Sequence, residues 1–274
     1  MPKVSVLTPL YNTEPAMLRE AIDSILGQTF TDFEFILLND SPENTKLDSI
    51  VKSYRDPRIV YIKNEKNLGI SASRNKLLKL AQGEYLAIFD HDDISLPTRL
   101  EKQVNYLDSH PYVGVCSGFS IEIPKNKLVR FPENNIDIKN ELLDKCSMIH
   151  SASMIRKSVM TDHNIVWEAD YSPNEDHMLW LRLLPFTLFH NIQEPLIYYR
   201  QYAGNTTNHQ LEKMRDKGRI IQCFAHKEYG YLLPENKKRK WVYLFRIIPF
   251  IRVKTTGTYK EFLLFGCIPL FTIK

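Results

Sequence analysis

Short apolar runs alternate with amphipathic segments through the first part of the chain, and this alternation restricts the fold more than any other feature. The expected strands span residues 4–8, 33–38, 58–62 and 85–89. The expected helices span residues 14–26, 43–54, 71–81 and 97–109. The strands are rich in β-branched and apolar residues, whereas the helices space their apolar residues three and four positions apart. Because strands separated by helices pair in parallel, the sequence predicts an α/β fold with a mostly parallel central sheet flanked by helices.

The later part of the chain has a less regular order. We expect further strands at residues 113–123, 152–155 and 196–199. We expect further helices at residues 136–145, 175–184 and 208–229. Neither an internal repeat nor a low-complexity linker is expected.

Three carboxylates, Asp90, Asp92 and Asp93, follow directly on the expected strand 85–89. Ligands of open α/β sheets bind outside the carboxyl ends of the strands, which is where this cluster lies. Carboxylates so close together repel one another, and a divalent cation would relieve the repulsion. Oxygen ligands suit Mg²⁺ or Mn²⁺, which keep several waters and bind substrate phosphates. The alternative is an acidic turn that caps the helix beginning near Pro97.

The sequence lacks several standard phosphate-binding and hydrolase motifs. It contains neither GxGxxG nor GxxxxGK[ST], and neither HExxH nor GxSxG. A dinucleotide-dependent dehydrogenase, a P-loop ATPase, a zincin and a serine hydrolase therefore lose their main support.

Polar residues also end the first two expected strands, at Thr8–Asn12 and at Asn39–Ser41. Parallel strands bring these ends to one rim with the acidic cluster and with Arg74. There Tyr11 could stack on a base, Asp40 could accept from a base N–H, and Arg74 with a metal could neutralise a diphosphate. Each residue also has a structural interpretation. Tyr11 could be a rim aromatic, Asp40 a helix cap and Arg74 a solvated charge.

With these residues in place, the chain resembles the inverting family 2 glycosyltransferases of GT-A fold, of the type that builds bacterial lipopolysaccharide and other surface polysaccharides. The matching segments, in the family's order and spacing, are 4–12 (VSVLTPLYN), 28–30 (QTF), 38–41 (LNDS), 67–75 (NLGISASRN), 89–93 (FDHDD), 150–156 (HSASMIR), 175–180 (EDHMLW) and 199–200 (YR). They cover about residues 3–207. Asn39 departs from the commoner Asp at its position.

The resemblance implies where a UDP-sugar donor binds. The nucleotide-binding residues that it implies are Thr8, Pro9, Tyr11, Asp40, Asn67, Arg74 and Asp90. It implies Asp92 as the ligand of Mn²⁺ or Mg²⁺, with Asp90 and His150 as further candidates. Related enzymes often carry a histidine two positions after the Tyr-Arg pair, where this chain has Tyr202. His150 is therefore a candidate compensating neighbour, and its alternative is a hydrogen-bonded structural histidine.

The resemblance also implies the chemistry. Asp176 would be the general base that deprotonates an acceptor hydroxyl, while the metal stabilises the departing diphosphate. Displacement from the opposite face inverts the anomeric centre, so an α-linked UDP-hexose or UDP-N-acetylhexosamine would give a β-glycoside. Glu175 and Asp93 are expected to support the site or to contact the acceptor. The competing interpretation is that Glu175 and Asp176 only stabilise a helix N-terminus.

Basic residues are concentrated in the tail. From Lys237 onward there are nine Lys or Arg and one acid, a net charge of +8, whereas residues 1–236 hold 27 basic and 31 acidic residues. Cations beside the large apolar residues of 241–251 favour binding to an anionic membrane surface, where a lipid-linked or oligosaccharide acceptor would be met. The alternative is a segment packed on the catalytic domain. No nucleic-acid recognition motif accompanies the charge, so no nucleic acid is expected as a partner.

These features divide the chain into a GT-A catalytic domain, residues 1–207, and a helical, basic tail, residues 208–274. The nucleotide-sugar half is expected at about 1–95 and the acceptor half at about 96–207. Scattered cysteines, with no expected signal peptide or spanning helix, predict a cytoplasmic protein that is peripheral at the inner face of the cytoplasmic membrane. Competing functions are a noncatalytic nucleotide-sugar-binding protein, a nucleotidyltransferase and a polyprenyl-phosphate glycosyltransferase.

Overall fold

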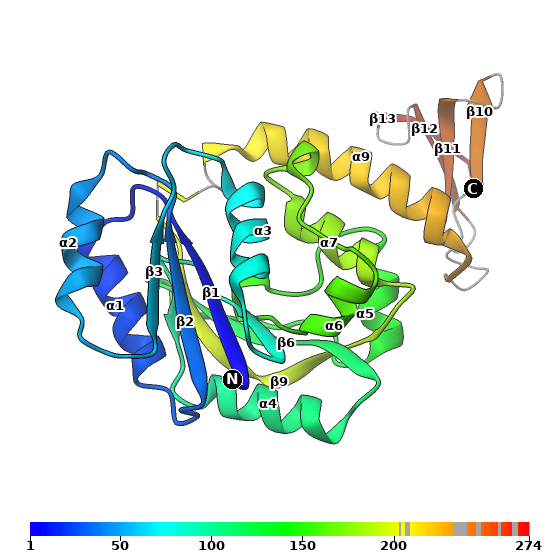
Figure 1. Cartoon of the computed structure of the whole chain (residues 1–274). Coiled ribbons are helices and arrows are strands. Elements are labelled where there is room, and N and C mark those ends of the chain that lie inside the picture. Colours follow the sequence, from blue (N-terminus) through cyan, green and yellow to red (C-terminus); the bar gives the residue numbers. More distant parts are fainter. Residues whose placement is uncertain are drawn as a thin grey trace.

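The computed structural model describes residues 1–202, 204–205 and 209–232, and beyond these the strand segments 240–244, 248–256, 259–264 and 268–273. Figure 1 shows a central sheet covered by helices, with the last four strands beside the end of the longest helix. The α/β class predicted from the alternation is confirmed.

The first half of the chain forms the expected parallel strands. They are β1 (Val4–Leu10), β2 (Phe33–Asn39), β3 (Ile59–Lys63) and β4 (Tyr85–Ile88), joined by α1 (Pro15–Leu26), α2 (Thr45–Ser53) and α3 (Ile70–Leu80). All three pairings in the order β3–β2–β1–β4 are parallel. Because helices cover both faces, β1 and β2 are mostly apolar and almost wholly buried. The carboxyl ends of these strands therefore meet at one edge, as predicted.

The second half makes the sheet mixed. Its elements are β5 (Ile94–Ser95), α4 (Arg99–Ser109), β6 (Val113–Ile123), β7 (Lys127–Val129), α5 (Asn135–Leu142), β8 (Met154–Arg156), α6 (Lys157–Asp162), α7 (Glu175–Leu183) and β9 (Leu188–Arg200), with short 3-10 turns at His150–Ala152, Ala169–Tyr171 and Gly230–Leu232. β8 lies between β4 and β6 and is antiparallel to both. The prediction of a mostly parallel sheet is nevertheless confirmed, because β6 and β9 pair in parallel over a long stretch, whereas the antiparallel pairings of β5, β7 and β8 are short.

β9 is much longer than the expected strand 196–199, because it continues across Pro195. The pairing of β9 with β6 is irregular where Phe119 faces Pro195. A proline cannot donate to a strand ladder and is tolerated at such an irregularity. The proline that seemed to begin a short strand therefore lies inside a long one.

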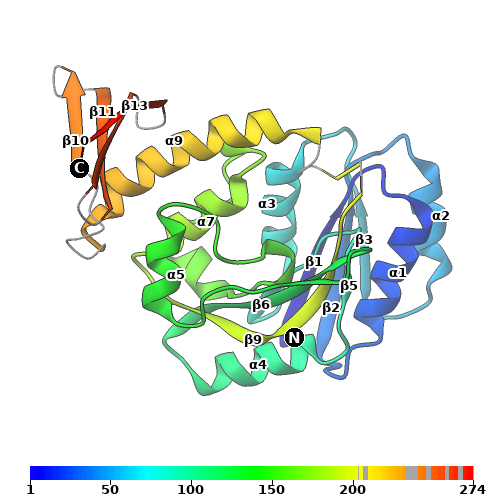
Figure 2. The same ribbon diagram turned by 180° about the vertical axis from the view of Figure 1, so that it is seen from behind.

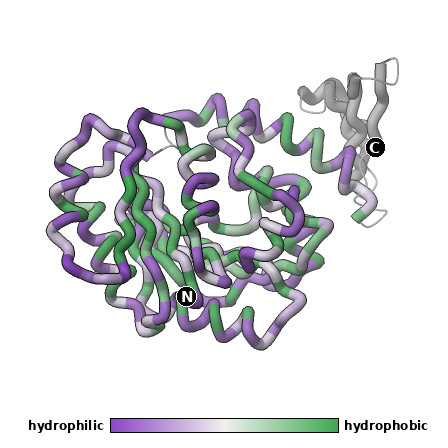
Figure 3. Tube along the Cα trace, in the orientation of Figure 1, coloured by the Kyte–Doolittle hydropathy of each residue, from purple (hydrophilic) through white to green (hydrophobic). Residues whose placement is uncertain are grey.

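Two apolar clusters pack against the two faces of the sheet. One joins β1 and β2 to α1, α2 and α4, and the other joins the sheet to α3, α5 and α7. Figure 2 shows α4 beside β9 from behind, and Figure 3 shows hydrophobic residues concentrated along the central strands. Trp167 and Trp180 belong to the second cluster and are almost fully buried.

The tail differs from the predicted helix after its first part. Helix α9 (Leu211–Tyr229) confirms the expected helix there, and its Ile221 and Ala225 are buried in the same cluster as α7. Farther on, β10 (Lys240–Leu244), β11 (Ile248–Thr256), β12 (Tyr259–Leu264) and β13 (Ile268–Ile273) form a separate antiparallel sheet. The helical prediction is wrong for these strands, whose β-branched and aromatic residues favour extended backbone.

Two predictions on the tail lie outside the described residues, namely the helix start at Asn208 and the basic run 237–239. Within the part of the chain that the structure describes, no helix is both long enough and apolar enough to span a membrane.

Candidate active site

The acidic loop after β4 is held in place by contacts from two segments, one at Ser151 and one at Arg200 and Tyr202. The backbone N–H of Asp90 donates to Ser151 Oγ (3.1 Å). Tyr202 donates its hydroxyl to Asp92 Oδ2 (3.0 Å), and Arg200 Nε donates to the backbone carbonyl of Asp92 (2.8 Å). The end of β9 therefore clamps the loop, and Tyr202, at the position where the family often has histidine, contacts the predicted metal ligand.

Asp93 differs from its two neighbours because it is buried. Its Oδ1 accepts a hydrogen bond from the backbone N–H of Arg200 (3.0 Å), and the residue is 1% exposed. Burial, together with the charges of Asp92 and Asp90, raises the pKa of Asp93 well above its ordinary value. A protonated carboxyl is a poor cation ligand, so this geometry suits the supporting role predicted for Asp93.

The carboxylate of Asp40 accepts hydrogen bonds from the loop that leads into α3. Its Oδ1 accepts from Asn64 Nδ2 and from the N–H of Leu68, both at 2.8 Å, and its Oδ2 accepts from the N–H of Gly69 (2.9 Å). A carboxylate has about four acceptor positions, so three are already taken. The side chain of Asn67 also donates to the Asp40 carbonyl (2.9 Å). Asp40 thus holds the loop before α3 in place, and these contacts leave one of its acceptor positions unused.

The other predicted nucleotide residues lie where β1 ends. Tyr11 is 56% exposed and free to receive a ring, whereas Thr8 and Pro9 are buried in the strand. The Thr8 hydroxyl has no hydrogen-bond partner among the described residues. Asn12 follows with φ of 45° and donates its N–H to Ser41 Oγ (3.1 Å), which ties the ends of β1 and β2 together.

Arg74 connects the acidic loop to the start of α7. Its Nη2 donates to Asp90 Oδ1 (3.0 Å) and its Nη1 to Glu175 Oε1 (2.7 Å). Arg74 and Glu175 are each 6% exposed. Burial opposes the charge on Arg74, but the carboxylates of Asp90 and Glu175 outweigh it and raise the pKa of Arg74. In turn Arg74 outweighs burial at Asp90 and lowers the pKa of Asp90.

This bridge changes the interpretation of Arg74. The sequence suggested a cation that neutralises a diphosphate or a solvated helix charge. The structure shows a buried guanidinium bound by two carboxylates, so the solvated alternative is wrong. Figures 1 and 2 both show α3 and α7 side by side over the sheet, and Arg74 links them across 101 positions of sequence.

Asp176 keeps few hydrogen bonds of its own. It lies in the first turn of α7, and its Oδ1 accepts the N–H of His177 (2.7 Å). Its Oδ2 lies 4.0 Å from Cys146 Sγ. Burial and the neighbouring charge of Glu175 raise the pKa of Asp176 to about 6. A carboxylate with this pKa can take up a proton near neutral pH, which is what a general base needs.

His150 is a hydrogen-bond acceptor for tryptophan. Its Nε2 accepts from Trp167 Nε1 at 3.0 Å, and its ring meets Trp167 edge-on at 87°. Burial and the nearby Arg74 lower the pKa of His150 well below its ordinary value, so the ring is neutral and its proton lies on Nδ1. Neither nitrogen then has a lone pair for a cation. This contact favours the alternative interpretation, in which His150 is a buried structural partner of Trp167, and its role as a metal ligand stays a prediction.

Several residues that organise the site were not predicted, among them Asn64, Cys146, Trp167 and Arg200. Arg200 was noticed only as part of a motif, and Trp167 lies outside the matching segments. No local sequence pattern predicts the roles of these residues, because their partners are distant in the sequence.

The donor set suits a divalent cation only with help from a substrate. Among the described residues, no three His, Cys, Asp or Glu side chains converge as a complete metal site. Mg²⁺ and Mn²⁺ bound with nucleotides typically take one or two carboxylates, with water and phosphate oxygens completing the shell. Asp92 and the partly exposed Asp90 fit that requirement, whereas the buried Asp93 does not.

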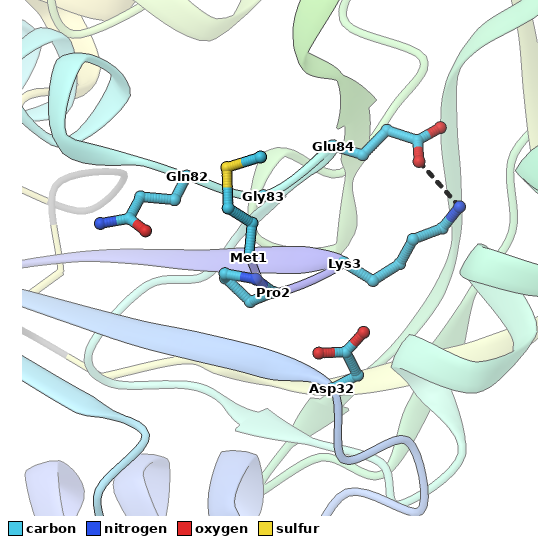
Figure 4. Close-up of a pocket in the computed structure, with 7 residues that line it drawn as sticks. All are labelled: Met1, Pro2, Lys3, Asp32, Gln82, Gly83 and Glu84. Carbon is cyan, nitrogen blue, oxygen red and sulfur yellow. Dashed lines mark hydrogen bonds and ion pairs between the residues drawn. The ribbon is translucent and has the colours of Figure 1, made fainter.

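A cavity of about 350 Å³ lies at the opposite end of the strands. It is lined by Met1, Pro2, Lys3, Asp32, Gln82, Gly83 and Glu84, as Figure 4 shows. Gly83 is needed there because a Cβ would come within 2.5 Å of the backbone nitrogen of Ser5. The cavity is at the amino ends of β1 and β4, so it is not part of the site at their carboxyl ends.

The chain has relatives of known class. Residues 5–168 match the family described as glycosyl transferase family 2. An uncharacterized glycosyltransferase of Methanocaldococcus jannaschii is 35% identical over 207 residues, 73% of this chain and 71% of that protein. The amylovoran biosynthesis glycosyltransferase AmsE of Erwinia amylovora is 34% identical, covering 66% of this chain and 69% of its own.

A third relative is WfaP of Escherichia coli, 25% identical over 85% of this chain and 91% of its own. Its name describes a β-1,3-glucosyltransferase that uses UDP-Glc and an α-D-GlcNAc-diphosphoundecaprenol acceptor.

Two solved structures share the fold at low sequence identity. TarS of S. aureus, in complex with UDP-GlcNAc, superposes with a TM-score of 0.69 at 18% identity over 84% of this chain and 71% of the TarS chain. A mannosyltransferase of Pyrobaculum calidifontis, in complex with GDP-Man and Mn²⁺, superposes with a TM-score of 0.59 at 15% identity over 85% of this chain and 72% of its own.

Proposed function

The chain belongs to glycosyl transferase family 2, and from this premise we propose that it transfers a hexose or N-acetylhexosamine from a UDP-sugar to a glycan hydroxyl with inversion. The product would be a β-linked unit of lipopolysaccharide or another surface glycan. The proposed base is Asp176, and the proposed donor site is the rim formed by Tyr11, Asp40 and Asp90.

One observation carries this proposal, the bridge from Asp90 through Arg74 to Glu175. It joins the acidic loop at the end of β4 to the first turn of α7, with contacts of 3.0 and 2.7 Å. An inverting transferase needs a base and a leaving group on opposite sides of one sugar. The bridge ties the loop that carries Asp92 to the turn that carries Asp176, the two residues proposed for these tasks, and this connection supports the proposal.

The proposed reaction is a direct displacement. The acceptor oxygen forms a bond to the anomeric carbon as its proton passes to Asp176, while the bond from that carbon to the diphosphate breaks and UDP departs. With a pKa of about 6, Asp176 is ionised at neutral pH and can accept this proton. Glu175 keeps Arg74 in place, and its negative charge raises the pKa of Asp176.

We propose that Asp92, with Asp90 beside it, holds Mn²⁺ or Mg²⁺. When bound, such an ion offsets the negative charge of the departing diphosphate. The Mn²⁺ named with the mannosyltransferase of the same fold supports this part of the proposal.

The acceptor is proposed to be lipid-linked or an oligosaccharide, met at the inner face of the cytoplasmic membrane. The names of two relatives support the choice of acceptor class. AmsE is named for amylovoran biosynthesis, and WfaP for an acceptor on diphosphoundecaprenol. The basic tail would bring the chain to that surface as a peripheral membrane protein.

A screen of UDP-sugars for UDP release, with and without Mn²⁺ and with candidate glycan acceptors, tests the proposal. We expect release that depends on both metal and acceptor, and a β-anomeric product by NMR. UDP-sugar binding without turnover would instead favour the noncatalytic binding protein, and release of diphosphate from a nucleoside triphosphate would favour nucleotidyl transfer. Product formation on polyprenyl phosphate itself would assign the chain to that acceptor class.

A further inference from the structure

The tail contains two copies of one sequence. Residues 240–254 (KWVYLFRIIPFIRVK) and residues 260–274 (KEFLLFGCIPLFTIK) are identical at six positions and apolar in both copies at six others. The copies begin 20 residues apart. The expectation that the chain holds no internal repeat is therefore wrong.

The strand pairing repeats with the same offset. In the hairpin of β10 and β11 the partners are Lys240 with Val253, Trp241 with Arg252, Val242 with Ile251, Tyr243 with Pro249 and Leu244 with Ile248. In the hairpin of β12 and β13 the partners are Lys260 with Ile273, Glu261 with Thr272, Phe262 with Phe271, Leu263 with Pro269 and Leu264 with Ile268. The pairing is irregular after Val242 and after Phe262, at the same place in both copies. The repeat is thus one structural unit used twice.

Each unit is mostly apolar toward the end where its two strands join and carries lysine at the other end, and in the first unit Arg246 falls between Leu244 and Ile248 in sequence. Leu244 and Ile248 pair at the apolar end of the first hairpin, as Leu264 and Ile268 do in the second. Arg246 is the single charged residue between Val242 and Ile251, and residues 262–273 contain none. Both copies begin and end with lysine. Such a gradient along the strands, repeated in two units, matches the change from headgroups to acyl chains at a lipid surface.

We propose that the hairpins β10–β11 and β12–β13 form a module that binds anionic phospholipid. The apolar ends of both hairpins enter the interface, and the lysines stay among the headgroups, where anionic lipids attract cations. The two hairpins form a sheet separate from the central one, and Figure 1 shows them at the end of α9. The module builds on the proposed membrane location, but it does not depend on the proposed transfer reaction.

Co-sedimentation of the full chain with vesicles tests this module. We expect binding to phosphatidylcholine vesicles that contain phosphatidylglycerol, and at least about tenfold weaker binding without the anionic lipid or at high salt, since screening removes surface attraction. The double variant Leu244→Asp with Leu264→Asp places a charge at the equivalent apolar position of each unit. We expect it to lower vesicle binding at least about tenfold.

The matched control is Leu211→Asp with Ile220→Asp, which adds the same charges on α9 at residues that are 47% and 53% exposed. We expect this control to bind anionic vesicles far better than the tail variant does. The triple variant Lys240→Gln, Lys254→Gln, Lys260→Gln leaves the apolar ends intact and neutralises three of the nine tail cations, so it should bind anionic vesicles more weakly and with a smaller salt dependence. It keeps the test valid even where the aspartate variant fails to fold.

Three outcomes would overturn the module. They are equal binding to neutral and anionic vesicles, equal loss in the α9 control, and a dimer in light scattering that the tail variant dissolves while vesicles bind neither protein. The last outcome would assign the sheet edges to a second copy of this chain. UDP release with a soluble acceptor, measured on the same variants, reports separately on the proposed transfer reaction and should be unchanged.

Discussion

Asp40 at the end of β2 and Asp176 at the start of α7 are both predicted site carboxylates, but their surroundings are opposite. Asp40 accepts three hydrogen bonds from the loop before α3. Asp176 accepts one backbone N–H, and burial beside Glu175 raises its pKa to about 6. Most acceptor positions of Asp40 are used by hydrogen bonds that hold the loop, whereas Asp176 can still take up a proton. The comparison separates residues that shape the site from the residue proposed to react.

The largest effect is expected from Asp176→Asn, which removes the proposed base and keeps its shape. Turnover should fall by roughly 10²–10⁴-fold, the usual contribution of a general base, while UDP affinity stays nearly constant. Single-turnover kinetics and UDP titration measure the two quantities. Asp170→Asn, a change of an exposed carboxylate nearby, should leave both unchanged. Near wild-type turnover in Asp176→Asn would remove Asp176 from its role.

Next comes Arg74→Gln, which removes the bridge between the two regions. Asp90 and the buried Glu175 then lose their cation, so the free energy of unfolding should fall by about 3–5 kcal/mol in urea titrations. Arg182→Gln breaks a half-exposed pair with Glu168 and should cost at most about 1 kcal/mol. Equal losses in the two variants would show that the bridge is not structural.

Asp40→Asn should have a smaller effect on the nucleotide rim. The new amide presents an N–H₂ to a loop that offers only donors, so one buried donor loses its acceptor at a cost of about 1–3 kcal/mol of unfolding free energy. UDP affinity should fall with it. The exposed Asp32→Asn, at the other end of β2, is the control for a lost charge. Unaltered stability would mean that the loop finds other acceptors.

Trp167→Phe tests whether His150 is a structural partner of Trp167 or a metal ligand. The wild-type imidazole should carry its proton on Nδ1, because Trp167 donates to Nε2. The variant leaves Nε2 without a donor, which should cost about 1 kcal/mol of unfolding free energy and allow the other tautomer. Nitrogen NMR shifts of His150 report the tautomer directly. A proton on Nε2 in the wild type would favour His150 as a ligand.

The smallest change expected is a shift in pH dependence. Because Asp176 must be ionised to act as a base, kcat/KM should fall about tenfold per pH unit below about pH 6. Glu175→Gln removes a negative charge that raises this pKa and frees Arg74 to lower it, so the acidic limb should move to lower pH. A limb that stays in place or moves upward would show that Glu175 does not tune Asp176.

Much of the fold could be predicted from local sequence. The alternation of strands and helices up to residue 109 needs only periodicity, which a short window contains. The antiparallel placement of β8 could not be predicted, because three residues give no sign of which strands they will join. The prediction of a helical tail was wrong for a similar reason. Its apolar and aromatic residues suit a membrane-surface helix and a hairpin equally well until strand pairing is known.

The sequence by itself determined the order of the first strands and the kinds of side chain at their ends, since these depend on neighbours in the chain. Only the tertiary structure decided which of those side chains are free. Arg74 meets Glu175 across 101 positions, and Trp167 meets His150 from a loop outside every matching segment. Burial, protonation and hydrogen-bond direction depend on neighbours in space. Asp40 and Asp176 carry the same chemical group, but only the folded structure makes the first a structural hydrogen-bond acceptor and leaves the second as a proposed base.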